Sequence, residues 1–526
     1  MRKWILVAIG GVCLLLVRPP GGAPSLAATK KSTGEADANT LRTDLDRIFA
    51  ESGLSSAVIA ARILSLPEKK GEGARVLYSI RASSASGGLI PASNMKLVTT
   101  AACWDRLGPD WQIRTYVGHI CAAKKGGAPD LAVIGGGDPS FSPHFYGEDV
   151  AGAFRQWAEV LKKSGLSAVG RVLLDDGLFE EQTVHPNWPP NQRHKWYEAP
   201  VAALNLNDNC VDLHIAPGKV GKAARLWIEP STAYVELENR LETVGSKKKH
   251  RFGLVRRPLD GRPGMHLRLS GGYWVKAHPV VENVTVVDPT MYFGTVLAET
   301  LRASGVAVAG PVVRARLVGE DGLRPGFVCD LIHTSRLDTT VRVANKRSQG
   351  LYAECLLKLL GAYGANPRAE YGVKAPADRP RLASWETGRA EARRWLAERG
   401  IPAAGCVIDD GSGLSKENRL TAMCVTELLR VMYERHGEAF ARTLAVTGRD
   451  GSLRSRMCNT AAEGRVFAKT GYVAGVSTLS GYVRTRSGRW LAFSILINDV
   501  PWGHVWRARL TQDKVCIRLV DYEVTK

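Results

Sequence analysis

The feature that most constrains the fold is a change of pattern along the chain near residue 104 and again near residue 335. Outside these points, segments whose apolar residues recur at the helical period alternate with strand-like segments. Between them, short strand-like runs are separated by many glycines and prolines. This order predicts one α+β domain, made of residues 38–103 and 336–526 and split by a β-rich insertion at 104–335. We expect two subdomains in the insertion, because a chain of 526 residues is long enough for roughly two to four domains.

The elements predicted in the outer parts are longer and more regular than those in the middle. Helices are predicted at residues 40–52, 91–102, 352–362, 385–400, 421–436 and 506–522. Strands are predicted at residues 57–66, 75–80, 131–134, 172–176, 465–468, 477–485 and 489–498. Both ends of the chain therefore supply helices and strands to the split domain.

The N-terminus has the pattern of a secretory signal. Two of the first three residues are basic, residues 5–17 are apolar, and small residues follow at Ser25, Ala27 and Ala28. The apolar run is short for a membrane span. We therefore expect residues 1–28 to be a signal peptide and the protein to be exported to the periplasm or cell wall. An uncleaved anchor, which would leave the protein membrane-associated, is the alternative.

The chain is strongly basic, with a formal net charge of +20. The predicted signal contains three positive charges, so about 17 remain after cleavage (20 − 3). Such a surface favours anionic partners, although a generally basic composition would give the same count. The densest run, residues 247–251, has no interleaved aromatic residues and is typical of a solvated loop. We therefore expect no nucleic-acid partner and leave contact with an anionic wall or membrane surface open.

Several kinds of chemistry are not supported. The ten cysteines form no C-x-x-C pair, so a zinc site is not expected. The chain contains no H-E-x-x-H, P-loop or G-x-S-x-G motif, and the glycines at 135–137 are not followed by a dinucleotide fingerprint. Asp409 and Asp410 are adjacent and so point in different directions, which favours a turn over an acid–base pair. We expect no metal site and no organic cofactor.

The first motif that could carry chemistry is S-x-x-K at Ser93–Lys96, at the start of a predicted helix. The spacing i, i+3 places the serine hydroxyl and the lysine amine on one face of the helix. A serine needs a base to become a nucleophile, and a lysine is a base near neutral pH only if its pKa falls from about 10.4. Alone the motif is more often structural than catalytic, and a second S-x-x-K at 246–249 lies in a charged segment.

Two later motifs strengthen the first. Lys469-Thr470-Gly471 lies on a predicted strand, where the lysine adds positive charge, the threonine a hydroxyl for a carboxylate, and the glycine room for a close backbone approach. The edge of such a strand can pair with an extended peptide. Between the two motifs, Ser348-Gln349-Gly350 stands where an S-x-N triplet would relay a proton to the leaving group. S-x-x-K and K-T-G in this chain order form the serine acyl-enzyme pattern.

Further motifs make a family resemblance specific. They are Pro91–Leu97, the Gly-Gly-Asp-Pro stretch at 136–139, Leu351–Glu354, Asp410–Ser415, Asn418–Leu420, Asp450–Leu453 and Ala468–Gly471. Together they resemble the class C low-molecular-weight penicillin-binding family of D-alanyl-D-alanine carboxypeptidases, some of which are also endopeptidases. The 255 residues between the first two serines (348 − 93) fit the large insertions of this family. The resemblance implies a β-lactamase/transpeptidase-like domain, with an antiparallel sheet flanked by helices.

The resemblance also implies roles for individual residues. Ser93 would be the acylated nucleophile and Lys96 its base, with Ser348 and Lys469 completing the proton network. Thr470, Gly471, Tyr472 and Gly350 would line the substrate side, and the backbone N–H groups of Ser93 and Tyr472 would form the oxyanion hole. Gly350 replaces the asparagine of S-x-N, and Tyr472 stands where serine or threonine usually follows K-T-G. Both departures concern substrate contacts.

Three functions follow from these residues. The first is a serine D-Ala-D-Ala carboxypeptidase, with some endopeptidase activity open, that acts on peptidoglycan stem peptides and is trapped covalently by β-lactams. The second is a catalytically impaired peptidoglycan-binding protein of the same fold, suggested by Gly350 and Tyr472. The third is a β-lactamase or esterase, which the long insertion disfavours. The four intact proton-transfer residues favour the first.

Overall fold

The computed structural model describes residues 34–522, apart from residues 68–71, 84, 86, 122–126, 148, 320–321 and 372–379. The predicted signal peptide, residues 1–28, lies outside the described residues. None of the described helices is both long and apolar enough to cross a bilayer.

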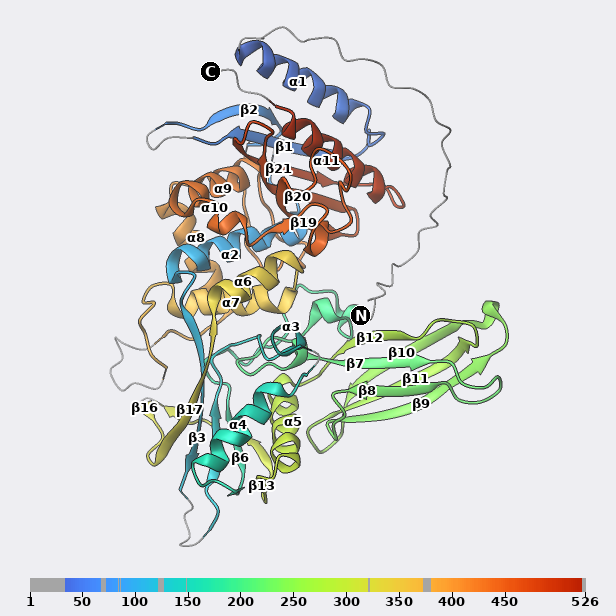
Figure 1. The fold of residues 1–526 in the computed structure, drawn as a ribbon, viewed down its shortest axis with the longest axis vertical. Coiled ribbons are helices and arrows are strands. Elements are labelled where there is room, and N and C mark those ends of the chain that lie inside the picture. Colours follow the sequence, from blue (N-terminus) through green and yellow to red (C-terminus); the bar gives the residue numbers. More distant parts are fainter. Residues whose placement is uncertain are drawn as a thin grey trace.

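A six-stranded antiparallel sheet, assembled from both ends of the chain, forms the centre of the split domain (Figure 1). Its strand order is β18-β19-β20-β21-β1-β2. The strands are β1 (Val58–Ser65), β2 (Arg75–Ile80), β18 (Ala445–Val446), β19 (Val466–Val473), β20 (Val476–Arg484) and β21 (Trp490–Asn498). The N-terminal strand β1 pairs with the C-terminal strand β21 over its whole length. The segments before and after the insertion therefore form a single sheet.

Helices cover both faces of this sheet, and the alternation of β21 shows why. Phe493 and Ile495 pack against α1 (Gly34–Ala50) and α11 (Val505–Val520), whereas Leu496 faces α9 (Ala422–His436) on the opposite side. Every residue of β21 is buried, as expected for a strand with helices on both faces. The remaining helices of the domain are α2 (Met95–Leu107), α6 (Leu337–Lys346), α7 (Gly350–Tyr363), α8 (Trp385–Glu398) and α10 (Glu438–Ala441).

The insertion leaves and re-enters the domain through two paired strands. β3 (Gln112–Ile120) follows α2, β17 (Phe327–Arg336) leads into α6, and the two are antiparallel with Gln112 opposite Arg336. They belong to a five-stranded mixed sheet of order β14-β6-β4-β3-β17, with β4 (Asp130–Ile134), β6 (Val172–Asp175) and β14 (Val312–Arg314). Helices α4 (Gly152–Lys163) and α5 (Pro289–Ala303) pack against one another and against this sheet. Shorter elements are α3 (Pro143–Tyr146), β5 (Ala168–Val169), β13 (Ala307–Val308), β15 (Val318–Gly319) and β16 (Gly322–Leu323).

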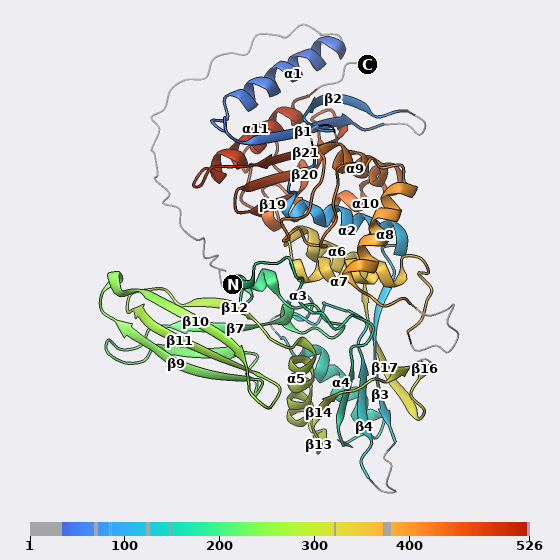
Figure 2. The same ribbon diagram turned by 180° about the vertical axis from the view of Figure 1, so that it is seen from behind.

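A second part of the insertion projects sideways from the body of the molecule as a β arm (Figures 1 and 2). It consists of two three-stranded sheets, β12-β7-β8 and β10-β11-β9. The strands are β7 (Cys210–Ala216), β8 (Arg225–Glu229), β9 (Val235–Val244), β10 (Arg251–Pro258), β11 (Met265–Trp274) and β12 (Val280–Thr285). Leu213, Leu267 and Leu269 are buried between the sheets and join the core around α5.

Two expectations differ from the structure. The boundary predicted between residues 103 and 104 falls inside α2, which continues to Leu107. The middle of the chain also contains α4 and α5, where no helix was predicted. Both carry helical signals: Phe154, Trp157 and Leu161 recur at the helical period in α4, and α5 begins with an Asp288 cap and Pro289.

Candidate active site

The first pair of predicted site residues meets at the start of α2. Ser93 lies in the short 3-10 turn Ala92–Asn94 that leads into the helix, and Lys96 lies in its first turn. The Lys96 amine is 3.2 Å from the Ser93 hydroxyl oxygen and donates a hydrogen bond of 2.7 Å to the Ser412 carbonyl. Lys96 is only 2% exposed. The serine therefore has an enclosed amine as its hydrogen-bonding partner.

The environment of Lys96 moves its pKa toward neutrality. Burial removes water from the ammonium form and lowers the pKa to about 8. The charges of Glu354 and Asp410 act in the opposite direction and favour the ammonium form. The balance leaves a substantial fraction of neutral amine at mildly alkaline pH, as a general base requires.

Glu354, on α7, is hydrogen-bonded to the loop that contains Gly411 and Ser412. Its carboxylate accepts the backbone N–H groups of Gly411 and Ser412 at 2.9 and 2.7 Å, and the indole N–H of Trp385 at 2.8 Å. Burial, together with the charge of Asp410, raises the pKa of Glu354 to about 7. Glu354 thus connects α7 with the loop that presents the Ser412 carbonyl to Lys96.

The second pair of predicted residues meets between the start of α7 and strand β19. The amine of Lys469, a fully buried residue on β19, donates to the Ser348 hydroxyl at 2.8 Å and to the Thr470 carbonyl at 2.9 Å. Burial and the nearby charge of Lys96 lower the pKa of Lys469 well below its ordinary value. Ser348 has φ of +62°, in a region that costs a residue other than glycine about 1–3 kcal/mol. The surrounding packing therefore holds Ser348 in its orientation toward Lys469.

Strand β19 is held tightly against the nucleophile turn. The side-chain amide of Asn94 donates to the Lys469 carbonyl at 2.6 Å, and Thr478 of β20 donates to the Pro91 carbonyl at 2.8 Å. A Cβ at Gly471 would overlap the Thr478 hydroxyl and come within 3.0 Å of the Ser93 nitrogen. Glycine at this position is therefore required for the approach of the strand to Ser93.

The residues predicted to contact substrate differ in their exposure and in their contacts. The Thr470 hydroxyl donates to the Ser452 hydroxyl at 2.7 Å, and Tyr472 is 54% exposed. Gly350 begins α7, and a Cβ there would lie 3.2 Å from the Tyr197 carbonyl of the insertion. β18 pairs only with Phe467 and Ala468, so no described strand pairs with residues 469–473 on the side opposite β20.

Asp410 organises the loop that carries Ser412. Its carboxylate accepts the backbone N–H groups of Gly413 and Ser415, at 2.6 and 2.7 Å, and the side-chain amide of Asn418 at 2.8 Å. Asp409 accepts from the Ser415 hydroxyl. The two aspartates therefore form the turn predicted from the sequence, and Asp410 also contributes charge near Lys96.

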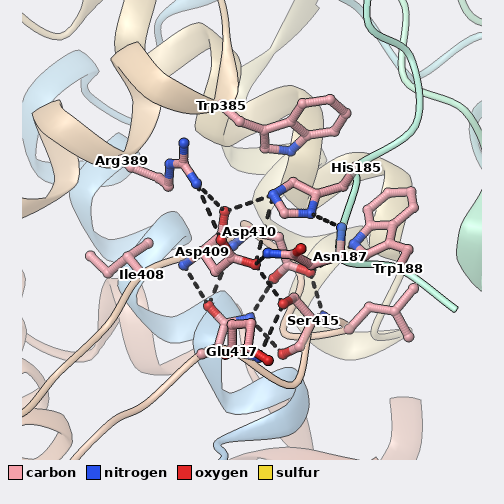
Figure 3. Close-up of polar contacts among 12 residues, drawn as sticks. His185, Asn187, Trp188, Trp385, Arg389, Ile408, Asp409, Asp410, Ser415 and Glu417 are labelled. Atoms are coloured by element: carbon pink, nitrogen blue, oxygen red, sulfur yellow. Dashed lines mark hydrogen bonds and ion pairs between the residues drawn. The ribbon is translucent and has the colours of Figure 1, made fainter.

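The insertion fixes this loop from outside (Figure 3). The Trp188 indole donates to Asp410 at 2.9 Å, the Asn187 amide donates to Asp409 at 2.9 Å, and the His185 ring lies 3.0 Å from the Asp409 carbonyl oxygen. At the start of α7, the Gln349 amide donates to the Asp208 carboxylate of the insertion. The insertion thus contacts both the Lys96 support and the Ser348 segment.

The structure brings Ser93, Lys96, Ser348 and Lys469 together as two hydrogen-bonded pairs. The second S-x-x-K, at 246–249, forms an exposed turn on the β arm. No role was predicted for Asn94, Glu354 or Ser412, although all three lie inside the motifs Pro91–Leu97, Leu351–Glu354 and Asp410–Ser415. In the part of the chain that the structure describes, no group of three His, Cys, Asp or Glu side chains is placed to hold a metal ion.

The chain is similar to several known proteins. Residues 41–511 match the profile of the D-Ala-D-Ala carboxypeptidase 3 (S13) family. The chain belongs to this family. It is also 31% identical over 519 residues to a D-alanyl-D-alanine carboxypeptidase of Actinomadura sp. (strain R39), covering 95% of this chain and 88% of that one. The family and enzyme class predicted from the motifs are thereby confirmed.

Solved structures confirm the predicted fold class. The crystal structure of penicillin-binding protein 4 (DacB) from Haemophilus influenzae matches with a TM-score of 0.73 at 20% identity, covering 91% of this chain and 99% of that one. The same protein in complex with a β-lactam matches with a TM-score of 0.68 at 19% identity and the same coverage. The chain therefore has the same overall fold as these proteins.

The packing of the Asp410 loop predicts the effect of Gly413→Ala. Gly413 has φ of +83°, and a Cβ there would overlap the Ala92 carbonyl beside the nucleophile. We expect a loss of about 2–5 kcal/mol in the free energy of unfolding, from backbone strain and overpacking together. Urea unfolding followed by fluorescence measures this loss.

Gly165→Ala is the matched control for this substitution. Gly165 has a similar φ of +84°, but a Cβ there would meet no atom within 4 Å. The control isolates the backbone cost and should lose about 1–2 kcal/mol. Equal losses at the two positions would contradict the proposed contact between Gly413 and the nucleophile turn.

Proposed function

We propose that the protein is an exported serine D-Ala-D-Ala carboxypeptidase that acts on peptidoglycan stem peptides through an acyl-enzyme on Ser93. The observation that carries this proposal is the buried Lys96 amine, which has a pKa of about 8 and lies 3.2 Å from the Ser93 hydroxyl. Membership of the S13 family and the likeness to a D-alanyl-D-alanine carboxypeptidase support the substrate class.

Acylation begins with proton transfer. The neutral Lys96 amine accepts the Ser93 proton, and the serine oxygen attacks the carbonyl carbon of the penultimate D-Ala. The backbone N–H groups of Ser93 and Tyr472 stabilise the negative charge that develops on the carbonyl oxygen. A single donor of this kind typically contributes roughly 3–4 kcal/mol to lowering the barrier.

The second pair serves the leaving group. The Lys469 amine donates a hydrogen bond to the oxygen of the Ser348 hydroxyl. The hydroxyl proton of Ser348 is therefore free to pass to the departing amine. The C–N bond breaks and the terminal D-Ala leaves with that proton. Ser348 regains a proton at the expense of the Lys96 ammonium, which restores the neutral Lys96 amine. Water then attacks the acyl-enzyme, with Lys96 again acting as base, and the peptide shortened by one residue is released.

The substrate lies along the free edge of β19. An extended peptide that pairs with residues 469–473 adds a strand beside the nucleophile, as in other modes of β-addition. The Thr470 hydroxyl and the Lys469 ammonium lie near the place of the terminal carboxylate. Gly350 and Tyr472 change the contacts to the rest of the peptide and leave the proton-transfer groups intact.

A β-lactam presents a strained amide to the same groups and acylates Ser93. We expect one labelled penicillin per molecule, attached to the peptide that contains Ser93, as mapped by mass spectrometry. Ser93→Ala should reduce labelling by at least about 10³-fold because the nucleophile is absent. A folded wild-type protein that takes up no label would favour the catalytically impaired binding protein instead.

The pKa of Lys96 predicts the pH dependence of acylation. Only the neutral amine accepts a proton, so the acylation rate should rise about tenfold per pH unit below pH 8 and level off above it. Stopped-flow measurement of β-lactam acylation from about pH 6 to pH 10 gives this profile. Lys96→Met should lower the rate by about 10²–10⁴-fold and remove the rise. A wild-type rate that does not change between pH 6 and pH 8 would contradict the role of Lys96.

A further inference from the structure

An exposed aromatic surface lies next to the end of the catalytic strand. Tyr472, Trp502 and Trp506 are 54%, 100% and 56% exposed, and they are the most exposed aromatic side chains among the described residues. Leu510, one helical turn after Trp506 on α11, is 46% exposed. Single exposed apolar residues are ordinary, whereas a group of them is typical of an interaction surface.

The fold brings these residues together from three segments. Tyr472 follows the K-T-G motif in β19, and the Arg509 guanidinium of α11 lies 5.6 Å from the centre of its ring. The loop between β21 and α11 carries Trp502, and its Val500 N–H donates to the Gly475 carbonyl in the turn after β19. We call Tyr472, Trp502, Trp506 and Leu510, with Arg507 and Arg509, the aromatic platform.

The charge of the platform is positive. The Arg507 guanidinium lies 4.8 Å from the ring centre of Trp506. The Asp513 carboxylate of α11 already forms an ion pair with Arg456, at 2.6 Å. Neither Arg507 nor Arg509 forms an ion pair with another residue in the described part of the chain. The exposed Arg509 guanidinium is therefore available to a carboxylate of a partner, whereas the Nε atom of Arg507 is buried.

We propose that the aromatic platform binds the glycan strand that carries the stem peptide. This inference rests on the proposed function, because it takes the peptide to lie along residues 469–473 of β19. A peptide in that position passes Tyr472, the first residue of the platform, so the polymer attached to it continues over α11. Indole and phenol rings stack on the C–H faces of sugar rings, and the Arg509 guanidinium pairs with a carboxylate of the stem peptides that the glycan carries.

Binding to the intact polymer tests the platform separately from catalysis. The full-length protein is sedimented with purified insoluble peptidoglycan, and the free fraction is measured. The double variant Trp502→Ala/Trp506→Ala should bind at least about five-fold more weakly, because aromatic anchors carry much of the energy of such surfaces. Ser93→Ala should bind like the wild type, since no covalent step is required.

Trp227→Ala is the matched control, because Trp227 is 43% exposed on the β arm. This variant should bind peptidoglycan like the wild type. Cleavage separates polymer recognition from chemistry: the double variant should lose about five-fold in kcat/KM on intact peptidoglycan and keep kcat/KM on a short acyl-D-Ala-D-Ala peptide within about two-fold.

Two outcomes would overturn the platform. One is unchanged binding to peptidoglycan by the double variant, shown to be folded by its penicillin labelling. The other is an equal loss of binding to vesicles of anionic phospholipid, which would identify a membrane surface as the partner. Failure of the wild type to label with penicillin would refute the proposed function instead, because sedimentation does not depend on acylation.

Discussion

The rest of the site depends on one buried lysine that is kept close to losing its proton. Burial alone would drive the Lys96 amine neutral, and the two carboxylates of Glu354 and Asp410 limit that effect. The charge of Lys96 in turn lowers the pKa of Lys469, so the two amines cannot both remain charged at little cost. Because electrostatic interactions are strong in a site shielded from water, small displacements of either carboxylate would change the balance.

This requirement explains why so much of the structure converges on one loop. Glu354 holds the backbone of Gly411 and Ser412, while Asp410 holds the backbone of residues 413 and 415. The insertion adds Trp188 to the carboxylate of Asp410. The inserted residues therefore form part of the support of Lys96, in addition to shaping the outer surface. A domain cut from the insertion would leave buried polar groups of this loop without partners, which is costly.

Whether an interaction of the site could be predicted depends on how far apart its residues lie in the sequence. The Ser93–Lys96 pair is local, since spacing i, i+3 on a helix is enough to place it, and the helices and strands of the outer parts were also recognisable from their periods. The Lys469–Ser348 pair joins residues 121 positions apart, and only the family resemblance suggested it. The role of Glu354 depends on burial and on N–H groups from a distant loop, which sequence patterns do not encode. Helices α4 and α5 were missed because glycines and prolines in the middle of the chain suggested strands throughout, although their periodicity and caps were present.

The surroundings of Gly350 and Tyr472 give a physical explanation for the two departures from the family pattern. At Gly350, a Cβ atom would lie 3.2 Å from the Tyr197 carbonyl oxygen of the insertion. The backbone of the insertion therefore leaves little room for a side chain at this position. At position 472, the tyrosine ring lies below the Arg509 guanidinium and is half exposed. In the proposed function, both changes remove a small polar contact close to the scissile bond, and Tyr472 adds contact area farther from it. Contacts remote from the reacting bond can contribute to the rate only when the substrate is large enough to reach them. The proposed function and the proposed platform together therefore imply that substrate selection shifts from the terminal dipeptide toward the polymer that carries it.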